Sequence, residues 1–222
     1  MKYRVTTIPV DLVLFFWQRI PGLVIHNLAK ARTLKTIFWH LNVDGLHGDY
    51  LEFGVAQGNS MRAAEIAEKT SFSKQIGVFR INRNLYGFDT FTQFISPVSS
   101  DIHPTWSGSK FTASLENVQR RFRRNSNIFL IQVDANELVL GEQVVAASTY
   151  GVTRKAAILL FDMDLYSPTK SALTWTKQYL QKGTFLIFDE YFSFGGDFEK
   201  GEARALHEFL NENPEISIRD YS

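Results

Sequence analysis

Acidic side chains stand at or beside the ends of five short apolar runs in this 222-residue chain. They are Glu52, Asp89, Asp134, Asp162 and Asp189. If the runs are parallel strands, their carboxyl ends meet at the edge where open α/β sheets bind ligands. One such aspartate is often only a turn residue or a helix cap. Five at one edge indicate a binding site.

The acids are densest in two short segments, residues 162–164 and 189–190. Neighbouring strands lie about 4.8 Å apart, so Asp162 and Asp189 could reach one hard cation, with Glu190 as a third ligand. Oxygen ligands favour Mg²⁺, Mn²⁺ or Ca²⁺ over zinc, and a cation would offset the repulsion between carboxylates. Asp164 lies two residues beyond Asp162, so it could face the same cleft and act as a general base.

A glycine-rich turn, residues 54–60, follows the first apolar run. Gly54 and Gly58 would let the backbone approach a ligand closely, and Ser60 could cap the next helix or donate to the ligand. The spacing differs from G-x-G-x-x-G, so a pyrophosphate would be poorly served. A zwitterionic amino-acid tail fits better, with Glu52 near its ammonium group.

Two later acids extend this predicted cofactor site. Asp89 is placed to accept hydrogen bonds from ribose hydroxyls. Asp134 stands where an adenine or ribose contact would fall, and a plain turn role is the open alternative.

The elements that must position these residues alternate along the chain. Apolar runs predict strands at residues 49–53, 85–88, 128–133, 156–161 and 184–188, and helical spacing covers 60–69, 114–124, 167–180 and 199–211. Ser167 is expected to cap its helix, with Pro168 at the first position, and residues 216–218 could begin a last strand. Strands separated by helices pair in parallel. The predicted fold class is α/β, a doubly wound, mostly parallel Rossmann-like sheet.

The N-terminal region looks helical over residues 8–42, with a break at Pro21. We therefore expect two parts, an N-terminal helical extension or lid over residues 1–47 and a ligand-binding domain over 48–222. The apolar stretch at 8–24 is too short and too interrupted to span a bilayer, and it lacks a signal-peptide cleavage site. A peripheral membrane contact by residues 14–17 stays an alternative.

Composition narrows the function classes. The 24 basic and 23 acidic residues leave a formal charge of +1, so no global field calls for nucleic acid or an anionic membrane. Cysteine is absent, which excludes disulfides and thiolate metal sites within this sequence and suits a cytoplasmic location. A homo-oligomer is possible.

The remaining histidines and arginines have plainer interpretations. His103 is the histidine of most interest, because its loop could overhang the site, although a plain surface position is the default. Trp106 and Phe111 could line a substrate pocket or simply anchor the same loop. His26 and the other histidines are expected to be structural or solvated. The basic run at residues 120–124 is expected to be a solvated helix face.

Four segments together resemble a known family. They are residues 52–60 (EFGVAQGNS), 86–91 (YGFDTF), 162–169 (DMDLYSPT) and 189–191 (DEY). In this order they look like the macrocin O-methyltransferase family, class I enzymes that depend on S-adenosylmethionine and Mg²⁺ and methylate sugars in natural-product pathways. The resemblance covers roughly residues 48–209.

The resemblance implies roles for the residues above. It implies an enzyme that transfers a methyl group to a hydroxyl of a small molecule, a sugar or glycosylated natural product. Asp164 would be the general base. The metal ligands would be Asp162, Asp189 and Glu190. The S-adenosylmethionine site would include Glu52, Gly54, Val55, Gly58, Ser60, Asp89 and Asp134.

The chain departs from the family pattern in two places. Glu190 stands where the family usually has aspartate, and the extra methylene could shift metal geometry. The sequence also ends soon after Ile218, where a class I methyltransferase adds a final antiparallel hairpin, and a missing hairpin would expose a sheet edge. A non-catalytic protein that keeps the cofactor pocket is therefore one alternative. A nucleotide-dependent oxidoreductase, another, is disfavoured by the missing G-x-G-x-x-G.

Overall fold

The computed structural model describes residues 15, 18–92, 113–140 and 143–221. Its main elements are α2 (Gly22–Val43), β1 (Asp49–Phe53), α3 (Asn59–Thr70), β2 (Leu85–Asp89), α4 (Leu115–Phe122), β3 (Ile128–Gln132), β6 (Ala156–Phe161), α5 (Tyr166–Thr176), β7 (Phe185–Phe188) and α6 (Gly201–Glu212). A two-stranded antiparallel pair, β4 (Val139–Leu140) and β5 (Gln143–Val144), stands apart from the main sheet. His103, Trp106 and Phe111 lie outside the described residues.

The main sheet has the strand order β3-β2-β1-β6-β7, and every neighbouring pair is parallel. The chain winds outward from β1 to β3 and then returns to the other side of β1 with β6. The order therefore reverses between β1 and β6, which is the switch point where such sheets bind ligands. The predicted doubly wound α/β fold is confirmed.

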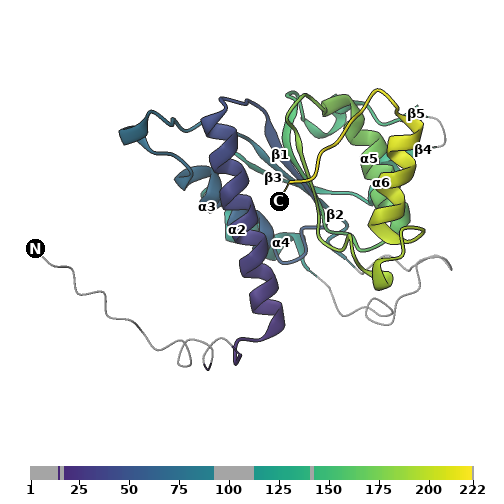
Figure 1. Ribbon diagram of the computed structural model, residues 1–222, viewed down its shortest axis with the longest axis horizontal. Coiled ribbons are helices and arrows are strands. Elements are labelled where there is room, and N and C mark those ends of the chain that lie inside the picture. Colours follow the sequence, from purple (N-terminus) through teal and green to yellow (C-terminus); the bar gives the residue numbers. More distant parts are fainter. Residues whose placement is uncertain (1–14, 16–17, 93–112, 141–142, 222) are drawn as a thin grey trace, which may run out of the picture.

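Helices cover both faces of the sheet (Figure 1). On one face α2, α3 and α4 bury Leu34, Phe38 and Met61 against side chains such as Tyr50 and Ile158. On the other face α5 and α6 pack around a second core that includes Leu51, Phe161, Trp175 and Phe209. The central strands β1 and β6 are buried along their whole length, as near-continuous apolar runs predict for strands covered on both faces.

Pairing register places four phenylalanines in a row beneath the carboxyl edge. Phe53 is in register with Phe88 and with Phe161, and Phe161 is in register with Phe188. Their rings stack with centroids 4.9, 5.5 and 5.0 Å apart across the four strands. The residue that follows each ring therefore emerges at the same level of the sheet edge, so Gly54 and the three aspartates that follow the other rings line up.

Two sequence predictions at helix and strand ends were wrong. Ser167 does not cap α5: the cap position is Leu165, and the Ser167 hydroxyl donates instead to Asn136 Oδ1 at 2.6 Å. Residues 216–218 do not form a strand. After α6 the chain instead places the Tyr221 ring against Phe185 of the edge strand β7, with ring centroids 5.2 Å apart. The predicted break at Pro21 agrees with the start of α2, since Pro21 occupies its N-cap position and residues 18–20 are not helical; the rest of the helix predicted before it, residues 8–14 and 16–17, lies outside the described residues.

Within the described part of the chain, no helix combines the length and apolar character needed to cross a membrane.

Candidate active site

A cavity of about 380 Å³ opens at the carboxyl ends of the strands, at the switch point. Its volume is in the range of small-molecule sites. Most residues predicted for the site line it: Gly54, Val55, Ser60, Asp89, Asp162, Asp164, Asp189 and Glu190. Glu52, Gly58 and Asp134 are not among its lining residues.

The glycine-rich turn has the left-handed backbone that its glycines favour. Gly54 has φ +92°, and Gly58, which caps α3, has φ +77°. A β-carbon on Gly58 would come within 2.9 Å of the Phe122 ring, so its role is to let α3 pack against α4. Arg121, expected on a solvated face, donates from Nη1 to Gln57 O at 2.8 Å and so supports the turn from α4.

Asp89 joins the loops that follow β1 and β2 at the cavity. Its Oδ2 accepts from the backbone N–H of Ala56 at 2.8 Å, and its Oδ1 accepts from that of Phe91 at 2.7 Å. Ala56 and Phe91 both have positive φ, 45° and 50°. These carboxylate contacts therefore hold two strained turn residues in place beside the cavity.

Glu52 lies beneath the turn and is fully buried. Tyr50 Oη donates to its Oε2 at 2.5 Å, and the Ser60 hydroxyl donates to its Oε1. Burial raises the pKa of Glu52 to about 8, against these two hydrogen bonds, which lower it. Ser60 is thus the side chain through which Glu52 reaches the cavity wall.

Asp134 has the turn role that the sequence left open as the alternative to a ligand contact. Its Oδ1 accepts from the backbone N–H of Asn136 at 2.8 Å, which caps the short 3₁₀ helix Ala135–Leu138. The neighbours Val133 and Ala135 line the cavity in its place. This end of the cavity is therefore apolar.

Lys30 of α2 lies between Asp162 and Asp189, the aspartates that follow β6 and β7. Lys30 Nζ is 2.6 Å from Asp162 Oδ2 and 2.7 Å from Asp189 Oδ2. Burial alone would lower the pKa of Lys30, but the charges of the two aspartates outweigh it and raise it. Burial raises the pKa of Asp162 to about 7, although Lys30 lowers it. Burial would also raise the pKa of Asp189, but Lys30 outweighs burial there and lowers it.

Asp164 lies two residues beyond Asp162 and lines the same cavity, as predicted. Its φ of +63° is left-handed, and aspartate tolerates that conformation better than most residues. Burial, together with the charges of Asp162, Glu190 and Asp189, raises its pKa to about 8. A strained carboxyl with a raised pKa in a cavity is typical of a proton-transfer group.

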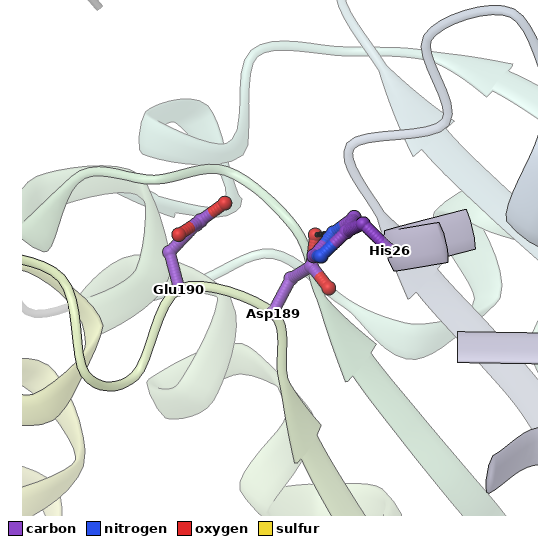
Figure 2. A group of neighbouring side chains, drawn as sticks. All are labelled: His26, Asp189 and Glu190. Atoms are coloured by element: carbon purple, nitrogen blue, oxygen red, sulfur yellow. Dashed lines mark hydrogen bonds and ion pairs between the residues drawn. The ribbon is translucent and has the colours of Figure 1, made fainter. Parts of the chain in front are cut away.

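A cation could be held on the β7 side of the cavity. The potential ligand atoms of His26, Asp189 and Glu190 all lie within 4.8 Å of one another. Figure 2 shows His26 reaching from its helix to Asp189, with Glu190 one residue further along the loop after β7. The distance from His26 Nε2 to Asp189 Oδ2 is 2.9 Å. His26 was expected to be structural or solvated, so its position at the acids corrects that expectation.

A buried acid on α6 connects the two acidic loops. Glu202 is 0% exposed; its Oε2 accepts from the backbone N–H of Glu190 at 3.0 Å and its Oε1 from that of Met163 at 3.4 Å. Burial raises its pKa well above the ordinary value. Glu202 thus sets the relative position of the loops after β6 and β7.

Sequence reasoning missed Lys30, His26 and Glu202. The first two carried a weak signal, because Leu23, His26, Asn27 and Lys30 follow helical spacing and line the cavity as one stripe of α2. Glu202 carried none, since it reads as an ordinary first-turn acid of an exposed helix.

The chain is similar to known methyltransferases. Residues 23–214 match the macrocin O-methyltransferase (TylF) family. The structure of the O-methyltransferase NovP is 18% identical, with a TM-score of 0.59 over 82% of this chain and 71% of that chain. CalS11, a calicheamicin methyltransferase, is 22% identical, with a TM-score of 0.55 over 94% and 79%. At these identities the two structures establish the shared fold. No curated protein matches the sequence.

Proposed function

The chain belongs to the macrocin O-methyltransferase family, and from that premise we propose that this S-adenosylmethionine-dependent O-methyltransferase acts on a sugar hydroxyl with the help of a divalent cation. One observation carries the proposal: Asp162, Asp164, Asp189 and Glu190 converge on the cavity that the glycine-rich turn also lines. The methyl donor and the acceptor hydroxyl thus have adjoining sites in one cavity.

The sugar part of the proposal has two supports. The family resemblance described above implies a sugar acceptor, and a second CalS11 structure, with a TM-score of 0.53 at 22% identity, is described as a TDP-rhamnose 3′-O-methyltransferase. A sugar or glycosylated natural product is therefore our proposed acceptor. Acceptor choice depends on side chains around the cavity rather than on the fold.

S-adenosylmethionine would be held by the β1 side of the cavity. The backbone of Gly54 and Val55, with Ser60 at the start of α3, would contact its amino-acid end, and Glu52 would act through Ser60. Asp89 would face the ribose, because it lines the cavity and its Oδ2 keeps a second lone pair beyond the contact with the Ala56 N–H. Gly58 and Asp134 would contribute by shaping the turn and the 3₁₀ helix, respectively. The apolar wall of Val133 and Ala135 suits an adenine ring.

A divalent cation would be held by Asp162, Asp189 and Glu190, and the ligand atoms of Asp189 and Glu190 lie within 4.8 Å of one another and of His26. The donor set fits, because carboxylate oxygens suit Mg²⁺ and Mn²⁺, and Lys30 Nζ marks a position where one cation contacts both aspartates. When bound, the cofactor supplies the methyl group and the cation supplies positive charge that favours ionisation of the acceptor hydroxyl.

The residues of the chain have three tasks in this reaction. Asp164 takes the hydroxyl proton on its carboxylate. Glu202 keeps the loops that carry Asp164 and Glu190 in register. Leu23 and Asn27 of α2 line the cavity beside the acids and bound the space open to the acceptor. Residues 1–47 would then act as an extension that completes the site. We place the reaction in the cytoplasm.

Two measurements test the proposal. Calorimetric titration with S-adenosylhomocysteine, with and without Mg²⁺, should give micromolar binding, and methyl transfer to sugar-bearing acceptors should stop in excess chelator. Asp162→Asn and Asp189→Asn should abolish transfer in folded protein, whereas Asp197→Asn, at a side chain 40% exposed in an ion pair with Lys200, should not. Full turnover in chelator would remove the metal from the proposal. Absence of S-adenosylhomocysteine binding by folded protein would contradict the cofactor site.

A further inference from the structure

Lys30 is in the place that a shared cation would take. Its ammonium group lies 2.6 and 2.7 Å from the Oδ2 atoms of Asp162 and Asp189, and its side chain is 9% exposed. The two aspartates come from neighbouring strand ends, and Lys30 comes from a helix more than 130 residues away in the sequence. An ammonium held by two carboxylates in a low-dielectric site neutralises charge that would otherwise repel.

The helix α2 makes a second polar contact at the same point. His26, one turn before Lys30, approaches the same Asp189 Oδ2 at 2.9 Å. Asp189 therefore has polar contacts with two side chains of α2. These contacts hold the N-terminal half of the helix against the acids at the strand ends.

Apolar packing changes along α2. In its C-terminal half Leu34, Ile37, Phe38 and Leu41 are at most 2% exposed, so this half belongs to the core. In the N-terminal half Leu23 is 69% exposed and Leu28 54%. The N-terminal turns are thus held at the site more by Lys30 and His26 than by the core, and they could separate from the acids without unpacking it.

We propose that Lys30 is an internal counter-ion that competes with the divalent cation for Asp162 and Asp189, so that metal binding requires Lys30 to withdraw and loosens the N-terminal half of α2. The inference rests on the metal site of the proposed function. An ammonium group and a divalent cation cannot both lie between the same two oxygens, because they would overlap and repel each other. Metal binding and the separation of the N-terminal half of α2 from the acids are then two parts of one equilibrium.

The test compares Mn²⁺ binding, by electron paramagnetic resonance at pH 8, in wild type, Lys30→Met and Lys35→Met. Lys35 is the matched control, because it lies on the same helix and donates to Thr70 away from the cavity. Lys30→Met should bind Mn²⁺ about tenfold more tightly or better, an effect of the size usual for groups that touch metal ligands. Lys35→Met should match wild type.

Hydrogen exchange in the wild-type protein gives a second readout that needs no variant. Mn²⁺ should speed exchange of the amides of residues 23–30 and leave those of 34–41 unchanged. Unchanged or weaker Mn²⁺ binding by Lys30→Met, with wild type binding normally, would overturn the competition and leave the metal site standing. If none of the three proteins binds Mn²⁺, the metal site itself fails and the competition with it. Binding of S-adenosylhomocysteine tests the cofactor site separately.

Discussion

Gly54 lies directly against the backbone of Asp162: a β-carbon on Gly54 would come within 1.9 Å of the Asp162 carbonyl oxygen. The two residues follow neighbouring strands, and Asp162 N–H donates to Phe53 O at 2.8 Å. The glycine-rich turn after β1 and the loop after β6 therefore meet at the point where the strand order reverses. A glycine at this position lets the two halves of the site share one cavity.

Gly54→Ala should therefore damage both halves of the site. The alanine would have to adopt φ +92° and displace backbone, so we expect a loss of about 3 kcal/mol or more in the free energy of unfolding. Gly22→Ala is the control, since nothing lies within 4 Å of a β-carbon there and its φ is not positive. Urea unfolding measures the difference. Equal midpoints for the two variants would contradict the close contact.

Asp164→Asn should remove the proton acceptor and preserve the shape of the site. Asparagine tolerates the left-handed backbone at φ +63°, so folding and S-adenosylhomocysteine affinity should stay close to wild type. We expect kcat to fall by about 10²- to 10⁴-fold, the usual contribution of a general base. A steady-state methyl-transfer assay measures this, with Asp197→Asn as control. Turnover within a few-fold of wild type would assign the proton to another group.

The raised pKa of Asp164 predicts opposite pH trends for stability and activity. With a folded pKa of about 8 against 3.8 for the ordinary group, the folded protein holds this proton between about pH 4 and 8 while the unfolded chain has lost it. The free energy of unfolding should therefore fall as pH rises through that window, by at least about 1 kcal/mol. Transfer should rise with pH over the same range, because only the ionised carboxylate accepts a proton.

Thermal and urea unfolding of metal-free protein from pH 5 to 8.5 measure the stability trend. Asp164→Asn should have a flatter profile than wild type, since asparagine does not titrate. A wild-type profile that rises with pH, or an unchanged slope in the variant, would show that Asp164 is not held in its protonated form.

Glu202→Ala should weaken the metal site without touching a proposed ligand. The change leaves the partly buried N–H groups of Glu190 and Met163 without their acceptor, at up to about 1–3 kcal/mol each. We expect lower stability and Mn²⁺ binding weaker by about tenfold. Glu202→Gln, which keeps one acceptor oxygen, should lie between this variant and wild type. Glu212→Ala, at an exposed side chain of the same helix, is the control. Unchanged Mn²⁺ affinity in folded Glu202→Ala would show that the loops hold their positions without Glu202.

Local patterns determined the scaffold and half of the site. Apolar runs, helical spacing and strand-end acids are each patterns within a short stretch of sequence. β1, β6 and the positions of Asp162 and Asp164 could therefore be predicted from them. The same local reasoning failed at Ser167 and at residues 216–218, because a hydroxyl and a short apolar run are compatible with several partners, and tertiary packing selects among them.

The sequence by itself determined that a doubly wound sheet would bring Gly54, Asp89, Asp162 and Asp189 to one edge, since parallel strands share the direction of their carboxyl ends. Only the tertiary structure decided what stands opposite those acids. Lys30 reaches them across 132 and 159 residues of chain, and it does so because α2 packs against the same face of the sheet as α3. Charge partners at such separations follow from how helices are oriented on a sheet, and spacing along the chain carries no information about that orientation.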